Sequence, residues 1–314
     1  MRNSLIKKEL GNIGLDVLSV NFMDVGTAKN NYVIKTDGEK YVLKLFTVDK
    51  RKKIQKLIKM LRKINEREEL VVSPIHDKVL DFGSMIGFVY RFVDGKHYRE
   101  IKIGKKIFLF GKIVGKFNRL AKNILPKGRN CEYVGRINKE VKATVRYLKG
   151  QKSLLHKKAR ALLDAGSKIV DKEYNHYKFR TQLIHGDLHY NNVFCFRRKF
   201  IILDVDGLEN SILAREVSTL ASYMVQRSIS DYKKDLEEFF SGYESEYKLF
   251  KKEKELIPVL MIIRKFGEIL YLLSQEKKGI LSEKEIKHFL GHTTRKLGLI
   301  INNFDKIKKI FSEI

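Results

Sequence analysis

The sequence predicts an α+β chain in which a small antiparallel β-rich lobe with one helix precedes a larger, mainly helical lobe. Residues 18–46 contain runs of β-branched and aromatic side chains separated by turn residues, a pattern typical of strands. Residues 49–64 then place apolar side chains at helical spacing. After Gly95, helical periodicity dominates the rest of the chain.

The first lobe is expected to be built on a hairpin. The runs "NNYVIKT" and "EKYVLKLF" flank Asp37 and Gly38, a dipeptide that favours a tight turn between two strands. The amphipathic helix 49–64 follows this hairpin. Two further β-like segments, 78–85 and 86–95, meet around glycines, so we expect them to complete the sheet.

The second lobe is expected to be helical, interrupted by a loop and a short hairpin. The loop and hairpin occupy residues 183–207, after a long helix. We place the N-terminal lobe at 1–93 and the C-terminal lobe at 94–314. The periodicity predicts helices over 103–124, 137–149, 152–173, 214–228, 231–247, 250–277 and 282–309.

The composition indicates a protein without membrane spans. The longest apolar run, 257–263, is far shorter than the roughly 20 residues that cross a bilayer. The N-terminus carries charges where a signal peptide needs an apolar segment. Cys131 and Cys195 have no metal-site spacing and imply no disulfide framework. We therefore expect a cytoplasmic protein, whose oligomeric state stays open.

The net charge of +27 raises the question of nucleic-acid binding. The lysines are spread over nearly every predicted helix, however, and do not gather in one arm. Within 49–64 they alternate with apolar residues at helical spacing and so form a solvated face. We expect a general bias toward lysine, with some attraction for anionic ligands, and no main role in nucleic-acid binding.

The stretch "LIHGDLHYNNVF" at 183–194 concentrates short polar side chains between two apolar ends. Asp187 is followed five residues later by Asn192, and Asp204 ends an apolar strand twelve residues further on. Phosphoryl transfer from ATP needs a carboxylate that orients and deprotonates a hydroxyl, and oxygen ligands for Mg²⁺. Asp187 fits the base, and Asn192 and Asp204 fit the metal ligands. The alternative is an ordinary turn, since both residue types favour turns.

The same chemistry needs an ammonium group on the nucleotide phosphates, and the first lobe offers Lys44. Side chains alternate along a strand, so Val42 and Lys44 share one face of the second hairpin strand. We expect Val42 to cover the adenine while Lys44 reaches the phosphates. Gly26 precedes the first hairpin strand, where backbone amides can approach phosphates.

These segments together resemble the aminoglycoside phosphotransferase and choline kinase-like superfamily, relatives of the protein kinases that act on small molecules. The resemblance spans roughly residues 20–225 and depends mainly on "LIHGDLHYNNVF" and "IILDVDG". It implies a bilobal protein-kinase-like fold that binds ATP and Mg²⁺. It also implies that Asp187 is the catalytic aspartate, that Asn192 and Asp204 bind magnesium, and that Lys44 binds the nucleotide. The spore-coat kinase-like branch of the superfamily also fits.

Six further residues complete the expected site. The linker residues Arg91, Phe92 and Val93 would present backbone groups to adenine. His185 is expected to order the catalytic loop rather than to carry a proton. His189 is expected to position the loop. Asp206 is expected to form either a second metal contact or a hydrogen bond. Asp206 would point the same way as Asp204 if the strand continues.

The "DFG" at 81–83 precedes the loop and is interpreted as a turn.

The sequence departs from the family at two places. The family helix after the lysine usually carries a glutamate that pairs with it, but residues 50–63 contain no acid. Glu66 and Glu68 come near the helix end, and Gln55 is a neutral alternative. At 214–224, Ser218 or Thr219 occupies the region where the family often has an aspartate, which we interpret as a difference in packing.

The function that the sequence favours is transfer of the γ-phosphoryl group of ATP to a hydroxyl of a small molecule. The alternative is a non-catalytic kinase-like protein that binds a nucleotide or partner as a scaffold, which the missing helix acid favours. A sugar, a choline-like alcohol or a phosphorylated metabolite suits the basic chain better than an aminoglycoside, whose polycationic charge needs acidic sites. The sequence leaves the acceptor, and the choice of ATP or GTP, open.

Overall fold

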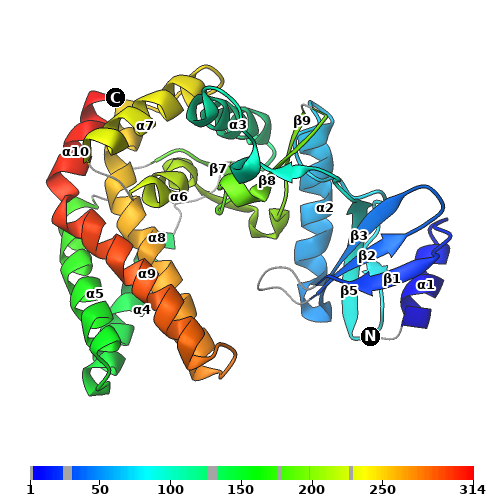
Figure 1. The fold of residues 1–314 in the computed structure, drawn as a ribbon, viewed down its shortest axis with the longest axis horizontal. Helices are drawn as coiled ribbons and strands as arrows, with labels where there is room; N and C mark the ends of the chain where they lie inside the picture. The colour runs from blue at the N-terminus through cyan, green and yellow to red at the C-terminus, as the bar shows by residue number, and fades with distance from the viewer. Residues whose placement is uncertain (1–2, 24–29, 126–132, 175–178, 198, 226–228) are drawn as a thin grey trace. The chain divides into compact units, whose positions relative to one another are not determined.

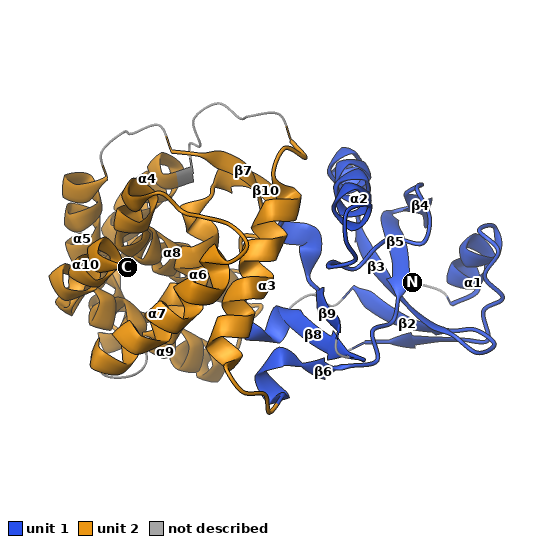
Figure 2. Ribbon diagram, turned by 90° about the horizontal axis from the view of Figure 1, so that it is seen from above, with its two compact units in different colours: residues 1–101, 190–208 blue, residues 102–189, 209–314 orange. Residues whose placement is uncertain are grey.

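The computed structural model divides the chain into two compact units, which Figure 2 colours separately. The first unit holds residues 1–101 and 190–208, and the second holds 102–189 and 209–314. The expected boundary between 93 and 94 stays a prediction about domains; the compact units differ from it by assigning 94–101 and 190–208 to the first. The structure describes residues 3–23, 30–125, 133–174, 179–197, 199–225 and 229–314.

The first unit is built on a five-stranded antiparallel sheet in the order β1-β2-β3-β5-β4. The hairpin predicted at Asp37 and Gly38 is confirmed: Gly38 has a φ of 79°, and β2 and β3 pair on either side of the turn. The "DFG" segment is the predicted turn, in which the Asp81 carboxylate accepts the Gly83 N–H. The strands are β1 (Ser19–Phe22), β2 (Asn31–Lys35), β3 (Lys40–Thr47), β4 (Leu80–Asp81) and β5 (Met85–Arg91).

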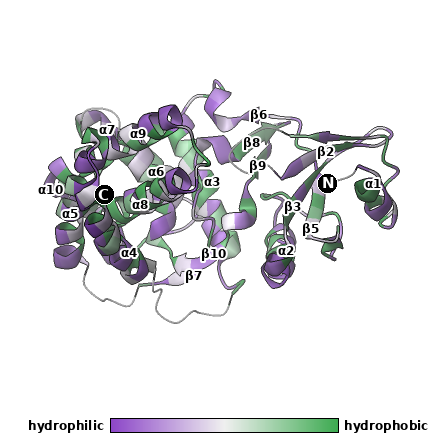
Figure 3. Cartoon of the chain, turned by 90° about the horizontal axis from the view of Figure 1, so that it is seen from below, coloured by the Kyte–Doolittle hydropathy of each residue, from purple (hydrophilic) through white to green (hydrophobic). Residues whose placement is uncertain are grey.

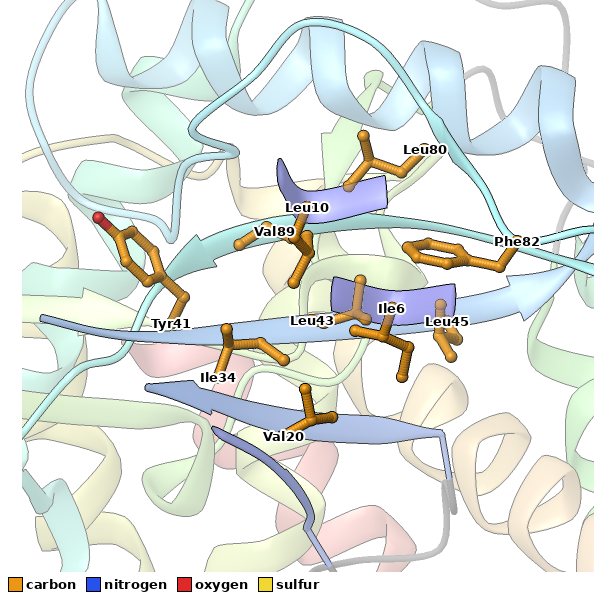
Figure 4. Packing of buried hydrophobic residues seen from close by; sticks show 10 residues of the cluster. All are labelled: Ile6, Leu10, Val20, Ile34, Tyr41, Leu43, Leu45, Leu80, Phe82 and Val89. Atoms are coloured by element: carbon orange, nitrogen blue, oxygen red, sulfur yellow. The ribbon is translucent and has the colours of Figure 1, made fainter. Parts of the chain in front are cut away.

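The two faces of β3 have different partners. Tyr41, Leu43 and Leu45 pack into an apolar cluster with residues of α1 (Asn3–Gly11), as Figure 4 shows. Val42 and Lys44 alternate with them and occupy the opposite face, as predicted. The sequence analysis did not predict α1. Because α1 fills one face of the sheet, the face that carries Lys44 is left for other contacts.

Helix α2 (Arg51–Asn65) follows β3 and confirms the predicted amphipathic helix. Its apolar side chains are buried and most of its lysines are exposed. Gln55 lies among the exposed residues, so it is no partner for the buried Lys44. The neutral substitute considered from the sequence is therefore wrong.

A second, three-stranded sheet in the order β6-β8-β9 belongs to the same unit. It joins β6 (Lys96–His97) to the hairpin β8 (Val193–Phe196) and β9 (Lys199–Ile202). The strand ends at Ile202, and a 3-10 turn covers Val205–Gly207. The premise that a continuing strand points Asp204 and Asp206 the same way is therefore wrong, because the chain turns between them.

The second unit is mainly helical, as predicted, and its two short strands β7 (Thr181–Ile184) and β10 (Glu209–Ile212) pair antiparallel. The long helix α8 contacts α4, α5, α6, α9 and α10, the relationship that Figure 1 displays. The helices are α3 (Lys106–Ala121), α4 (Tyr133–Tyr147), α5 (Leu154–Glu173), α6 (Ala214–Met224), α7 (Ile229–Glu244), α8 (Lys251–Lys277), α9 (Glu283–Asn302) and α10 (Phe304–Glu313).

The helix expected over 282–309 is two helices, and Asn303 separates them. Its side-chain amide donates to the Leu299 carbonyl at 2.9 Å, and its backbone N–H donates to the same oxygen at 3.2 Å. Asparagine competes with the helical backbone in this way, so helices often end at such a residue. Periodicity alone did not detect the break, because apolar spacing continues into α10.

Helices α3 and α7 approach each other with almost no side chain between their backbones. A Cβ at Gly111, Gly115 or Gly242 would overlap a carbonyl oxygen of the facing helix. The three glycines therefore permit a contact that alanine would prevent.

Hydrophilic and hydrophobic residues alternate around the helices, as Figure 3 shows. Exposed lysines and arginines occur along many of the described helices and not in one arm. In the parts of the chain that the structure describes, no helix is long and apolar enough to cross a membrane.

Candidate active site

Lys44 of the first unit forms ion pairs with two aspartates from the distant hairpin region. Its ammonium lies 2.9 Å from Asp204 Oδ1 and also contacts Asp206 Oδ1. The Lys44 residue is buried, with 7% of its surface exposed. Although burial by itself lowers the pKa of Lys44, the charges of Asp206 and Asp204 hold it above its ordinary value. Lys44 therefore stays protonated at neutral pH.

The two aspartates converge on Lys44 through a turn and not through a strand. Asp204 has a φ of 54°, in the left-handed region that few non-glycine residues adopt. Asp206 lies in the 3-10 turn that follows. Such backbone conformations are concentrated at functional sites, where the surrounding structure maintains them.

Asn192 lies at the same end of the hairpin as Asp204. Its carbonyl accepts the N–H of Leu203 at 2.8 Å, directly beyond the pairing of Val193 with Ile202. The neighbouring Asn191 uses its carbonyl differently, with His97 Nδ1 at 2.9 Å. The bond between Asn192 and Leu203 therefore places Asn192 across the hairpin from Leu203, the residue that precedes Asp204.

The donor set at this end of the hairpin suits magnesium. Among the described residues, no group of three or more His, Cys, Asp or Glu side chains is arranged to hold a metal ion. Mg²⁺ does not require one, because it usually takes one or two protein oxygens together with water and substrate phosphates. The Asp204 side chain is 55% exposed and so remains accessible to an ion.

Tyr90 is a residue of this region that the sequence analysis missed. It pairs with Val42 across β3 and β5, which puts its side chain on the face of Val42 and Lys44. Burial raises the pKa of Tyr90 to about 12, a value that the charges of Lys44, Asp206 and Asp204 also influence. Alternation along β5 could have indicated this residue once the register was known.

The other nucleotide residues expected from the sequence have these positions. Val42 is 4% exposed beside Lys44 in β3. Arg91 ends β5 and pairs with Glu39 at 3.3 Å. The Phe92 N–H donates to Lys40, and the Val93 carbonyl accepts the Gly95 N–H, so these two backbone groups are already engaged. Gly26 lies outside the described residues.

The acid that the family helix usually supplies to the lysine is replaced here. Within the described chain, the ion pairs of Lys44 go to Asp204 and Asp206 and not to Glu66 or Glu68. Asp206 therefore supplies a second carboxylate where α2 offers none.

The catalytic loop of the second unit begins after β7 and is held by a buried acid. The carboxylate of Glu216, 1% exposed at the start of α6, accepts the N–H of His185 and, at 3.4 Å, that of Gly186. Burial raises the pKa of Glu216, while His185 and these backbone donors lower it, with a net rise. Ser218 and Thr219, the residues of this region considered from the sequence, both donate to the Arg215 carbonyl, and Thr219 Oγ1 also donates to the Gly186 carbonyl of the loop at 3.5 Å.

Asp187 is 40% exposed and contacts two cationic or titratable groups of its own unit. Arg264 Nη2 lies 2.5 Å from Asp187 Oδ1, and His189 Nε2 lies 3.9 Å from Asp187 Oδ2. The His185 residue is completely buried, in keeping with the expected structural role. Arg264 was not predicted, since nothing in the sequence distinguishes it from the other basic residues of α8.

The fold, the lysine with its two aspartates and the loop with its exposed aspartate define a chain of the kinase-like phosphotransferase class. Residues 22–249 match the phosphotransferase enzyme family, known as APH, and the chain belongs to this family. The prediction of a small-molecule phosphotransferase is thereby confirmed at the level of the family. No curated protein sequence matches the chain.

Solved structures support the same fold at low sequence identity. An amicoumacin kinase, in complex with AMP-PNP and Ca²⁺, has a TM-score of 0.66 at 17% identity, covering 95% of this chain and 96% of the other. A choline kinase from Streptococcus pneumoniae has a TM-score of 0.67 at 15% identity, covering 94% and 98%. A microcompartment-associated aminopropanol kinase has a TM-score of 0.67 at 13% identity, covering 97% and 98%.

Proposed function

We propose that the protein transfers the γ-phosphoryl group of ATP to a hydroxyl of a small molecule. The observation that carries the proposal is the ion pairing of Lys44 with Asp204 and Asp206, which joins the N-terminal sheet to the hairpin after the catalytic loop. A lysine and an aspartate in this relationship are what kinase-like enzymes use to hold nucleotide phosphates and magnesium. Membership of the phosphotransferase family supports the same reading.

In the proposed mechanism, Lys44 binds the α- and β-phosphates and Val42 covers the adenine. Nucleotide binding would draw the Lys44 ammonium away from Asp204 toward the phosphates, so that the Asp204 carboxylate is freed for a metal. Asn192 and Asp204 would hold Mg²⁺, which supplies neutralisation of the phosphate charge. Asp206 would remain with Lys44 and keep its side chain in position.

Asp187 is the proposed general base. Its carboxylate would accept a hydrogen bond from the acceptor hydroxyl and orient the oxygen toward the γ-phosphorus. It would take the proton as the new P–O bond forms and the bond from the γ-phosphorus to the β,γ-bridging oxygen breaks, which releases ADP. Glu216 would position the loop through the amides of His185 and Gly186. His189, 3.9 Å from Asp187, would help to fix the direction of that carboxylate.

The second candidate, a nucleotide-binding scaffold without activity, was favoured by the absence of an acid in α2. Asp206 weakens that argument, because it contacts Lys44 without help from the helix. The proposal therefore keeps catalysis as the function. We further propose that the reaction takes place in the cytoplasm and that the acceptor is not a nucleic acid. We also propose that the chain belongs to the spore-coat kinase-like branch of the superfamily.

The test is ATP turnover with Mg²⁺ across a panel of hydroxylated metabolites, run in parallel with Asp187→Ala. We expect turnover on at least one acceptor and a loss of about 10²- to 10⁴-fold in the variant, the usual contribution of a general base. Binding of AMP-PNP should be unchanged by the substitution. Nucleotide binding without turnover on any acceptor would favour the scaffold function, and turnover unaffected by Asp187→Ala would remove the assigned base.

A further inference from the structure

The catalytic loop of the second unit lies against a cluster of basic side chains that the proposed mechanism does not use. Arg264 and Lys265 come from α8, and Lys296 comes from α9. The ring of Tyr223, from α6, lies among them and also contacts His189 of the loop at 5.3 Å. We call Arg264, Lys265, Lys296 and Tyr223 the basic cluster.

Arg264 connects the basic cluster to the catalytic aspartate. Its Nη2 lies 2.5 Å from Asp187 Oδ1, its Nη1 donates to the Gly186 carbonyl at 3.3 Å, and its Nε donates to Glu268 at 3.1 Å. The Arg264 side chain is 18% exposed, so it is partly accessible to solvent. Its guanidinium also hydrogen-bonds Tyr223. A guanidinium carries five N–H donors, more than these four contacts use, and its planar geometry suits phosphate and carboxylate oxygens.

The two lysines of the basic cluster are almost completely buried, and only one has an acidic partner. Lys265 pairs with Glu268 at 2.7 Å. Lys296 Nζ donates to the Tyr223 carbonyl at 3.3 Å, and no carboxylate of the described chain lies within 4.0 Å of it. The two ammonium groups lie 4.7 and 4.9 Å from the centre of the same Tyr223 ring.

The balance of charge in the basic cluster and its acidic partners is consequently positive. Three cations, Arg264, Lys265 and Lys296, lie with two carboxylates, Asp187 and Glu268. A buried cation without a counter-charge is unfavourable, because the desolvation of the ammonium is not compensated. In agreement, burial and the charge of Lys265 lower the pKa of Lys296 to about 8. An added anion would relieve this imbalance.

We propose that the phosphoryl acceptor carries an anionic group, a phosphate monoester or a carboxylate, that pairs with Arg264 in the field of Lys265 and Lys296. The inference rests on the proposed function and names the class of its acceptor. Because one guanidinium would contact both the anion and Asp187, the anionic group lies within a few bonds of the hydroxyl that receives the phosphoryl group. A cationic acceptor would meet like charge at this position.

Binding of inorganic phosphate to the full-length protein tests the inference directly. The protein is first saturated with AMP-PNP and Mg²⁺, so that the nucleotide phosphates occupy their own site, and phosphate is then titrated by calorimetry. We expect wild-type protein to bind phosphate, Arg264→Gln to weaken the affinity by about tenfold or more, and Lys296→Met to weaken it several-fold, as expected for charged contacts of about 1–2 kcal/mol. Arg264→Lys keeps the charge and should weaken binding less than Arg264→Gln.

Lys254 provides a matched control for Lys296. It is also a buried lysine, 8% exposed and 5.3 Å from the centre of an aromatic ring, that of Phe240, but it has a carboxylate partner, Glu244, at 2.8 Å. Lys254→Met should leave phosphate affinity unchanged, and thermal unfolding of each variant verifies that it is folded. If wild type does not bind phosphate, the phosphate monoester is excluded and the inference then requires preferential turnover of glycerate. If Lys254→Met weakens phosphate binding as much as Lys296→Met does, the inference is overturned.

Turnover with matched acceptors separates the two anionic groups and the two proposals. Glycerol, glycerol 3-phosphate, glycerate and ethanolamine are compared at equal concentration. Preference for glycerol 3-phosphate or for glycerate supports the inference and identifies the group. Preference for glycerol or ethanolamine would overturn the inference and leave the proposed phosphotransferase intact. A failure to bind AMP-PNP with Mg²⁺ would instead contradict the proposed function itself.

Discussion

The surroundings of Lys44 and of Asp187 are opposite in charge. In the first unit, one buried ammonium contacts two aspartates, so carboxylates are in excess. In the second unit, Asp187 and Glu268 lie with a cluster of three basic side chains, so cations are in excess. The two proposals accordingly give each environment a different kind of ligand: a metal cation in the first and an anion in the second.

The difference also separates two levels of function. The residues around Lys44 are proposed to carry the nucleotide chemistry, whereas the basic cluster beside the proposed base would concern one class of acceptor. A fold shared by many enzymes carries its specificity in such local residues. The solved structures compared above share the fold of this chain, but their acceptors do not identify the acceptor of this chain.

The largest effect is expected from the aspartates of the first unit. Asp204→Asn should lower kcat/KM by at least about 10²-fold and raise the Mg²⁺ concentration needed for half-maximal activity, since the charge-stabilising group is lost. Asp206→Asn should cost less, because this side chain is proposed to hold Lys44 and not the metal. Steady-state kinetics with varied Mg²⁺ measures both variants. Equal losses and equal shifts in Mg²⁺ dependence would assign metal binding to both residues.

A smaller effect is expected from Glu216, which holds the loop that carries Asp187. Glu216→Gln weakens two buried backbone contacts and should lower the free energy of unfolding by about 1–3 kcal/mol. Nucleotide affinity should stay the same while kcat falls, because the loop positions the base. Chemical denaturation and kinetics provide the measurements. Glu237→Gln, at an exposed acid that pairs with Lys233 at 3.9 Å, is the control and should change stability by less than about 0.5 kcal/mol.

The smallest effect is expected from the pH dependence of Lys296. Its pKa is near 8 in the folded protein and near 10.5 when unfolded, so the unfolded state binds more protons between these values and stability rises with pH there. Lys296→Met should remove this rise, whose slope is at most about 1.4 kcal/mol per pH unit for one proton. The charged or titratable groups near Lys296 are Lys265, Glu268, Arg295, His292 and Tyr223.

Urea unfolding of wild type and Lys296→Met from pH 7 to pH 10 measures the difference. The advantage of the variant should be greatest at pH 7 and shrink toward pH 10. A constant difference across this range would show that Lys296 is not destabilised by its surroundings.

The sequence predicted the parts of the molecule that depend on local patterns. The hairpin at Asp37 and Gly38 and the amphipathic helix 51–65 follow from turn chemistry and periodicity, and both are present. The positions of Lys44 and Asp187 followed from their place in motifs. Such signals act over a few residues and so can be found without knowledge of tertiary contacts.

The remainder depends on contacts between distant segments. Glu216 looks like any acid at a helix start, and only its burial beneath the loop shows its role. Arg264 and Lys296 are two among 64 lysines and arginines, and spacing alone does not say which of them are buried. The convergence of Asp204 and Asp206 on Lys44 arises from a 3-10 turn that the strand-like sequence concealed.

The glycines between α3 and α7 have a consequence for how the protein emerges from the ribosome. Helix α3 ends at residue 121 and α7 begins at 229, so the surface of α7 that packs on α3 is synthesised about a hundred residues after α3. Until α7 is synthesised, the glycine face of α3 cannot pack against it. A nascent chain stopped before α7 would therefore expose apolar surface, and translation would have to pass the catalytic loop before this helix pair can form.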